Sequence, residues 1–188
     1  MPKLIIGFVG QAGCGKGTAA DILRNEYGAD YFRFSTVMSD ILNRLAIERS
    51  RQNLIKLSEA VRQVFGENAF SFAIEKDAIQ SPKDIVIVDG IRRMEDISAL
   101  EALPNFKMIA IDVPTRIRYE RIINRGEKAH EKDMTWEQFL EEEKASTEIS
   151  IPPVMARAWR TIPNDGTPEI FAEKIRELMK ELGFFQIH

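Results

Sequence analysis

The most constraining feature of this sequence is a glycine-rich stretch that follows a short apolar run near the start of the chain. The apolar run covers residues 4–9, and the stretch reads GQAGCGKGT over residues 10–18. The residues that follow, Ala19 to Leu23, carry apolar side chains at helical spacing. This order of strand, glycine-rich turn and helix is typical of a phosphate-binding P-loop. Glycines let backbone N–H groups converge on phosphate oxygens, and the helix N-terminus and Lys16 add positive charge.

The order of residues within the loop separates it from a dinucleotide-binding turn. That turn reads G-x-G-x-x-G; Gly13 and Gly15 fit the first two positions, but the third is occupied by Thr18 and a lysine lies inside. We therefore predict a nucleotide-binding loop in which Lys16 is also catalytic. Its predicted nucleotide-binding residues are Gly10, Gly13, Cys14, Gly15, Lys16, Gly17 and Thr18.

The position after the lysine departs from the general P-loop pattern. A Ser or Thr there binds Mg²⁺ through its hydroxyl, but here Gly17 follows the lysine and Thr18 comes one residue later. We expect the metal to be held mainly through water and carboxylates, with Thr18 as a further candidate ligand. The form G-x-x-G-x-G-K-G-T resembles the adenylate kinases and other nucleoside monophosphate kinases. The resemblance extends from about residue 5 to residue 167 and implies ATP and Mg²⁺ as cofactors.

Length and composition fit one globular domain over residues 1–188, with 44% hydrophobic and 29% charged residues. The formal net charge of −3 argues against nucleic acid as a partner. No apolar run approaches the roughly 20 residues of a membrane span, and no leader-like segment opens the chain, so we expect a cytoplasmic protein that contacts no membrane. The partners we expect are small-molecule nucleotides.

Continuous apolar runs at residues 85–88 and 108–111 predict strands that are buried on both faces. Weaker strand candidates cover residues 31–34 and 159–162, and helical patterns lie between the strands. We therefore predict an α/β, three-layer P-loop kinase fold with a parallel five-stranded sheet. The resemblance adds a helical acceptor-binding insertion at about residues 36–80 and a short lid at about residues 126–147. Ligands are expected at the carboxyl ends of the strands.

The segment after the second predicted strand is similar to the S-T-G-D-x-L segment of monophosphate kinases, with two extra residues. The resemblance implies that Thr36 and Arg44 face the phosphoryl acceptor and that Asp40 faces the metal and phosphates. The alternative is that Thr36 or Ser39 caps a helix whose first turn contains Asp40. On the next predicted helix, residues 54–65, Arg62 corresponds to an arginine that holds the acceptor's phosphate in related kinases, or it is a solvated helix residue.

An acidic residue, Asp89, ends the third predicted strand and is followed by Gly90. A carboxylate in this place, far along the chain from a P-loop, indicates a ligand that holds Mg²⁺ through water. The pattern is similar to D-G-x-x-R of adenylate kinases, whose arginine grips the acceptor phosphate. That role falls on Arg93, with its neighbour Arg92 as a second candidate, because two adjacent arginines suit a bidentate anion.

A helix that begins after the fourth predicted strand places Arg118, Arg121 and Arg125 on one face. Like charges so arranged repel unless something anionic lies opposite. The segment ERIINR resembles the family's D/E-R-h-h-x-R, which implies that Arg121 packs on the donor base and Arg125 contacts its phosphates, both as catalytic residues. The alternative is a basic face paired with Glu120 and Glu127.

Two further segments complete the candidate site. A capping box at Thr135 predicts a helix within the lid, where Lys144 is the lysine that corresponds to the arginines of family lids. The turn N-D-G-T resembles one that passes beside the donor base in dephospho-coenzyme A kinases, which implies backbone contacts from Asn164 and Gly166. The single cysteine, Cys14, excludes an intramolecular disulfide; it is either an oxidisable thiol or a small residue that fills the loop.

The chain shows no Ser-His-Asp or Cys-His arrangement for covalent catalysis. A phosphate cradle, a lysine, a metal-holding acid and several arginines suit phosphoryl transfer, which depends on positioning and charge neutralisation. Our leading hypothesis is an ATP-dependent phosphotransferase that acts on a nucleoside or deoxynucleoside monophosphate. A dephospho-coenzyme A kinase-like enzyme acting on a hydroxyl, with Asp40 as the base, is the first alternative. A P-loop ATPase without a small-molecule acceptor is the second.

Overall fold

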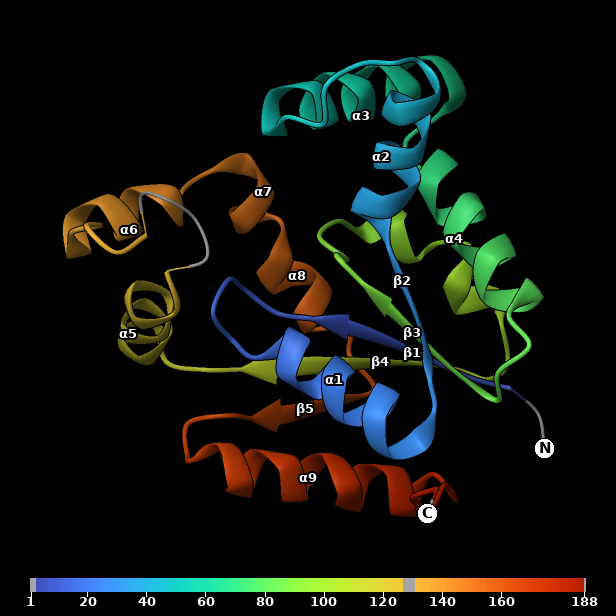
Figure 1. The fold of residues 1–188 in the computed structure, drawn as a ribbon, viewed down its shortest axis with the longest axis vertical. Helices are drawn as coiled ribbons and strands as arrows, with labels where there is room; N and C mark the ends of the chain where they lie inside the picture. The colour runs from blue at the N-terminus through green and yellow to red at the C-terminus, as the bar shows by residue number, and fades with distance from the viewer. Residues whose placement is uncertain (1–2, 127–130, 188) are drawn as a thin grey trace.

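Five strands form one sheet in the computed structural model, which describes residues 3–126 and 131–187. The strands are β1 (Leu4–Val9), β2 (Asp30–Arg33), β3 (Ile85–Asp89), β4 (Phe106–Asp112) and β5 (Arg160–Pro163). Every neighbouring pair is parallel, and the order across the sheet is β2-β3-β1-β4-β5 (Figure 1). The predicted parallel five-stranded sheet is therefore confirmed.

Helices cover both faces of this sheet. The helices of the described residues are α1 (Lys16–Tyr27), α2 (Phe34–Arg44), α3 (Arg51–Phe65), α4 (Ala69–Gln80), α5 (Thr115–Arg125), α6 (Trp136–Glu142), α7 (Ser146–Ile149), α8 (Ile151–Met155) and α9 (Pro168–Glu181), with the 3₁₀ turns η1 (Met94–Ile97) and η2 (Leu100–Ala102). In Figure 1, α1 and α9 lie on one side of the sheet and α4 on the other, while α5 and α6 lie beyond the ends at which β1 and β4 stop. This arrangement is the predicted three-layer α/β fold.

The continuous apolar runs arise because both faces of the central strands are buried. Along β1, Leu4, Ile6 and Phe8 join the core cluster shared with α1 and α9. Ile5 and Val9 point the other way, into the core cluster that includes residues of α4 and α8. Because side chains alternate between the two faces of a strand, a strand that is covered on both sides is apolar at consecutive positions.

Local capping explains where several helices begin. Ser50 Oγ accepts a hydrogen bond from Asn53 N (3.2 Å), so α3 begins at Arg51, three residues before the predicted helix. The predicted capping box at Thr135 is confirmed, because its Oγ accepts from Gln138 N (3.2 Å) and Gln138 Oε1 accepts from Thr135 N (2.8 Å).

The capping alternative for the segment after β2 is wrong. Helix α2 already begins at Phe34, so Thr36 and Ser39 lie inside it and Asp40 is beyond its first turn. Ser39 Oγ instead donates back to the Ser35 carbonyl (2.6 Å), as hydroxyls within helices do.

The two predicted insertions correspond to helical segments between strands. Helices α2, α3 and α4 occupy the chain between β2 and β3, and α3 lies farthest from the sheet at the top of Figure 1. The predicted lid contains α6, while Glu127, Lys128 and the other residues from 127 to 130 lie outside the described residues. Within the described ranges, no helix has the length and apolar character needed to cross a membrane.

Candidate active site

The P-loop is packed so closely that two of its glycines are sterically required. Gly13 (φ +78°) and Gly15 (φ +102°) both adopt backbone conformations that side chains disfavour. A Cβ at Gly13 would lie 2.8 Å from the Arg118 carbonyl oxygen, and a Cβ at Gly15 would collide with the Asn164 side chain. The loop is thus pressed between α5 and the turn that follows β5, and it leads directly into the N-terminus of α1.

Lys16 folds back onto the loop that precedes it. Its ammonium donates to the carbonyl oxygens of Gly10 (2.5 Å) and Gln11 (3.2 Å) and lies 3.5 Å from Cys14 Sγ. Cys14 is buried and belongs to the core cluster between the sheet, α1 and α9. Its burial favours the interpretation that it is a small residue that fills the loop.

The first turn of α1 and the turn after β5 border the P-loop. Gly17 and Thr18 are exposed in that first turn. The side chain of buried Asn164 donates from Nδ2 to the Cys14 carbonyl (2.9 Å), and the backbone N–H of Asn164 donates to the Asp112 carbonyl (2.8 Å). The sequence predicted only backbone contacts here, so the side-chain contact of Asn164 with the P-loop is an addition.

The donor-base residues predicted from two distant segments lie together. Arg121 Nη2 lies 3.5 Å from Asn164 Oδ1 and 3.5 Å from the Gly166 carbonyl oxygen. Since Asn164 also contacts the P-loop, Arg121 and this turn form one continuous wall beside the phosphate-binding loop.

Asp89 lies at the carboxyl end of β3 and is buried. Its Oδ2 accepts from the Tyr31 hydroxyl (2.6 Å) and lies 3.4 Å from Arg33 Nε, and its Oδ1 accepts from Gly90 N (2.7 Å). Burial, followed by this hydrogen bond to Asp89, raises the pKa of Tyr31 far above its usual value. The sequence prediction missed Tyr31 and Arg33.

The pairing of β2 with β3 is what brings these groups together. Arg33 lies directly opposite Asp89 in the parallel register of the two strands. In sequence, Arg33 and Asp89 belong to separate segments, and nothing in either segment reveals the register. Only the strand order of the sheet could have identified this contact.

A cavity of about 580 Å³ is lined by Ala12 of the P-loop, by residues of α2 and α3, and by residues of the predicted lid. Six arginines line it: Arg33, Arg51, Arg62, Arg92, Arg93 and Arg125. Four of them were predicted as site residues, and Arg33 and Arg51 were not. The lining does not include Thr36, Asp40 or Arg44, which are exposed on α2. The structure therefore separates these three residues from the other acceptor candidates.

Arg118 is the most deeply buried arginine of the site and was missing from the predicted site residues. Its side chain is 2% exposed, and its guanidinium forms a two-pronged ion pair with Glu143, just after α6, in which Nη1 and Oε1 are 3.0 Å apart. Nη1 also donates to the Ala12 carbonyl (3.2 Å), and Glu143 Oε2 accepts from Gln11 Nε2 (2.9 Å). The anion that faces Arg118 is therefore the Glu143 carboxylate, which belongs to the predicted lid and also contacts Gln11 of the P-loop.

The sequence suggested Glu120 and Glu127 as partners of the α5 arginines, and Glu127 lies outside the described residues. Arg125 pairs with the buried Glu131 (3.1 Å), and Glu120 pairs with Arg116 (3.2 Å). The lid lysine Lys144 is exposed and pairs with Glu141 (2.8 Å). Lys144 is therefore engaged in an ion pair at the surface of the predicted lid.

The arginines after β3 also meet carboxylates from other elements. Arg92 pairs with Glu148 of α7, and Arg93 lies 3.4 Å from Glu67 in the turn between α3 and α4. Both arginines line the cavity. The counterions of these two cavity-lining arginines therefore come from α7 and from the α3–α4 turn.

The P-loop, the parallel sheet and the cavity beside them define a P-loop protein with a kinase-like α/β fold. Residues 9–139 match the AAA domain family. The UPF0200 protein of Sulfurisphaera tokodaii is 32% identical over 179 residues, which cover 95% of this chain and 97% of that protein. The UPF0200 protein of Thermococcus kodakarensis is 30% identical over 141 residues, which cover 72% of this chain and 75% of that protein. The chain belongs to the UPF0200 family.

Solved structures share the fold at low sequence identity. The protein TT1252 from Thermus thermophilus has a TM-score of 0.60 at 17% identity, with 97% of this chain and 99% of that chain covered. Shikimate kinase from Aquifex aeolicus has a TM-score of 0.55 at 14% identity, with 96% and 98% covered. These similarities confirm the P-loop kinase fold predicted from the sequence.

Proposed function

We propose that this protein transfers the γ-phosphoryl group of ATP to a nucleoside or deoxynucleoside monophosphate. The observation that carries the proposal is the cavity that adjoins the P-loop and is lined by six arginines. Arginine offers paired N–H donors that match two oxygens of a phosphate group. A cavity with this lining suits an acceptor that is itself a phosphate monoester.

The chemistry of such an acceptor agrees with the carboxylates near the cavity. The second pKa of a phosphate monoester is about 6, so its attacking oxygen is already anionic at neutral pH and no general base is required. Asp40, the base we considered for a hydroxyl acceptor, does not line the cavity. Five carboxylates line the cavity among the described residues; Asp96, Glu131, Glu143 and Glu148 are each held in an ion pair with an arginine, and Glu142 is the fifth.

The proposed roles follow from the positions of the side chains. The P-loop, Lys16 and Arg125 bind the ATP phosphates. Arg121 lies beside the donor base with Asn164 and Gly166. Arg92 and Arg93 hold the acceptor phosphate. We leave Thr36, Asp40 and Arg44 out of the acceptor site, because they are exposed away from the cavity lining.

Magnesium fits this site only as an ion that keeps most of its water. Among the described residues, no group of three or more His, Cys, Asp or Glu side chains is arranged to hold a metal. Mg²⁺ in phosphoryl-transfer enzymes needs one or two protein ligands beside phosphates and water. Asp89 and Thr18 are the residues we propose for that purpose, with Asp89 acting through water, and the ion would neutralise phosphate charge.

The test is ATP turnover by the purified protein against a panel of acceptors. The panel contains ribo- and deoxyribonucleoside monophosphates, dephospho-coenzyme A and a sample without acceptor. We expect ADP formation that depends on a monophosphate and yields the matching diphosphate. Turnover that depends only on dephospho-coenzyme A would assign a hydroxyl acceptor. ATP hydrolysis that no acceptor changes would assign an ATPase and overturn the proposal.

A further inference from the structure

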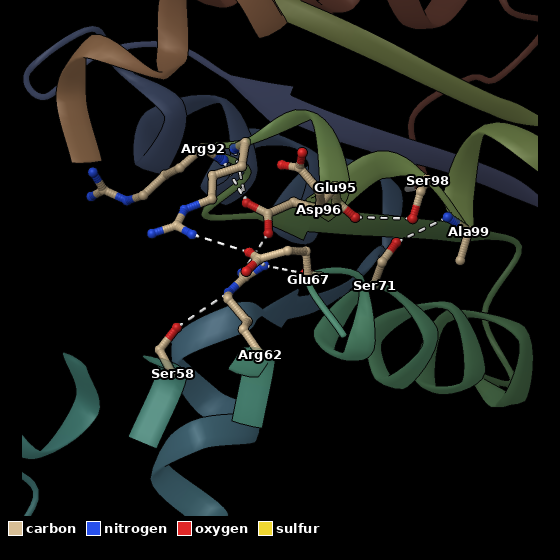
Figure 2. Close-up of polar contacts among 10 residues, drawn as sticks. Ser58, Arg62, Glu67, Ser71, Arg92, Glu95, Asp96, Ser98 and Ala99 are labelled. Atoms are coloured by element: carbon tan, nitrogen blue, oxygen red, sulfur yellow. Dashed lines mark hydrogen bonds and ion pairs between the residues drawn. The ribbon is translucent and has the colours of Figure 1, made fainter. Parts of the chain in front are cut away.

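One carboxylate outside the predicted site residues contacts the backbone of both acceptor-side arginines. Asp96, in η1, has a side chain that is 4% exposed. Its Oδ2 accepts hydrogen bonds from the backbone N–H groups of Arg92 (2.9 Å) and Arg93 (3.0 Å) (Figure 2). The carboxylate therefore holds the peptide groups from which the two cavity-lining guanidinium groups extend.

The other oxygen of Asp96 faces α3. Oδ1 accepts from Arg62 Nη2 at 2.7 Å, and the Arg62 side chain is 9% exposed. The remaining Arg62 donors also have protein partners, because Nε lies 3.4 Å from Ser58 Oγ and Nη1 donates to the Glu67 carbonyl. The Arg62 guanidinium further lies over the Phe70 ring, 5.4 Å from its centre. Arg62 is thus occupied by protein groups on every nitrogen, which argues against the acceptor-phosphate role expected from the sequence.

Stability alone is a poor reason for this arrangement. Burying two opposite charges costs desolvation free energy that their attraction barely offsets, so a hydrophobic pair of similar size is often as stable. What a hydrophobic pair does not supply is an acceptor for the N–H groups of Arg92 and Arg93. The arrangement therefore favours a role in fixing geometry.

We propose that Asp96 is a positioning residue for the acceptor phosphate: its side-chain oxygen fixes the backbone at Arg92 and Arg93, from which the two cavity-lining guanidinium groups extend. The inference rests on the proposed function, since it concerns the arginines assigned to the acceptor.

The decisive comparison uses two double variants that differ only in whether residue 96 accepts hydrogen bonds. Arg62→Met with Asp96→Asn removes both charges but keeps a side-chain oxygen for the two backbone N–H groups. Arg62→Met with Asp96→Leu removes the charges and the oxygen. Because misplacing a binding group by about 1 Å costs on the order of 10²-fold, we expect the Leu variant to raise the acceptor KM by roughly tenfold or more. The Asn variant should stay within about threefold of the wild type, and both should keep the ATP KM.

The control is a pair at the opposite edge of the sheet. Arg160 of β5 and Glu181 of α9 form a two-pronged surface ion pair, and Arg160→Met with Glu181→Leu should leave both KM values unchanged. Circular dichroism and thermal melting establish that each variant is folded, and Asp96→Ala replaces Asp96→Leu if the latter is not. Calorimetric binding of the acceptor provides a reading that does not depend on turnover.

The outcomes separate this inference from the proposed function. If the wild type phosphorylates a monophosphate and the Asn and Leu variants have the same acceptor KM and affinity, Asp96 has no positioning role. An equal rise in the KM values for ATP and for the acceptor also overturns it, because it indicates a general loss of structure. If the wild type uses no monophosphate at all, the proposed function itself fails.

Discussion

Replacing Glu143 with Gln tests the contact that joins the lid to the P-loop. In the wild type, the Glu143 carboxylate accepts from both terminal nitrogens of Arg118 and from Gln11 Nε2. The substitution keeps the shape of the side chain and one oxygen but removes the charge. Arg118, whose side chain is 2% exposed, then keeps a full positive charge without a carboxylate partner, facing the Ala12 carbonyl, the Thr115 hydroxyl, the Phe139 ring and an amide oxygen.

The expected loss follows from the burial of the two partners. Breaking a buried ion pair by removing one partner costs about 3–5 kcal/mol, because the remaining charge is uncompensated. Glu143 is 15% exposed and Gln retains one acceptor, so we take the lower end, about 3 kcal/mol. For a chain of 188 residues each kcal/mol shifts Tm by about 2–4 °C. Glu143→Gln should therefore lower Tm by about 6–12 °C.

The measurement is thermal unfolding followed by circular dichroism, with urea unfolding at 25 °C as the second reading. Glu181→Gln is the matched control, because the Arg160–Glu181 pair has the same two-pronged form but is 41% and 47% exposed. Exposed pairs contribute about 0–1 kcal/mol, so this control should shift Tm by less than about 4 °C. Equal shifts in the two variants would refute the reasoning that burial determines the cost.

Three further predictions concern the site. Lys16→Ala should lower kcat by a factor on the order of 10² or more with an unchanged circular dichroism spectrum, as for loss of a key cation, and near-normal turnover would remove the P-loop assignment. Arg93→Ala should raise the KM of the acceptor far more than that of ATP in steady-state kinetics; equal effects would contradict its acceptor role. Tyr31 has a raised pKa because it is partly buried and donates to Asp89, so above pH 10 the unfolded chain loses a proton that the folded chain keeps. The free energy of unfolding should thus fall as pH rises above about 10, by up to about 1.4 kcal/mol per pH unit more than in Tyr31→Phe. The measurement is urea unfolding of both proteins at several pH values, and an equal fall of the two free energies with pH would contradict this.

Features with a local cause could be predicted from the sequence. The P-loop required Gly13 and Gly15 because their backbone angles and close neighbours leave no space for a side chain. The strands at residues 85–88 and 108–111 were recognisable because burial on both faces removes polar alternation. The residues Arg121 and Asn164 were predicted from motif resemblance, and the structure places them in contact.

Features with a distant cause could not be predicted. The role expected for Arg62 depended on its place in a resembling helix, but its partner Asp96 is 34 residues further along the chain. Asp40 was the carboxylate considered for a hydroxyl acceptor, yet it is exposed on α2 and does not line the cavity; which side of α2 faces the cavity depends on the elements packed against it, which lie elsewhere in the chain.

The sequence by itself determined the strands and the phosphate-binding loop, because each depends on residues within a few positions of one another. The tertiary structure alone decided which charges face each other: Arg33 with Asp89 through strand register, Arg62 with Asp96, and Arg118 with Glu143, 25 residues apart. The physical reason is range. An ion pair requires its atoms within about 4 Å, a distance that chain spacing does not encode once the partners belong to different elements.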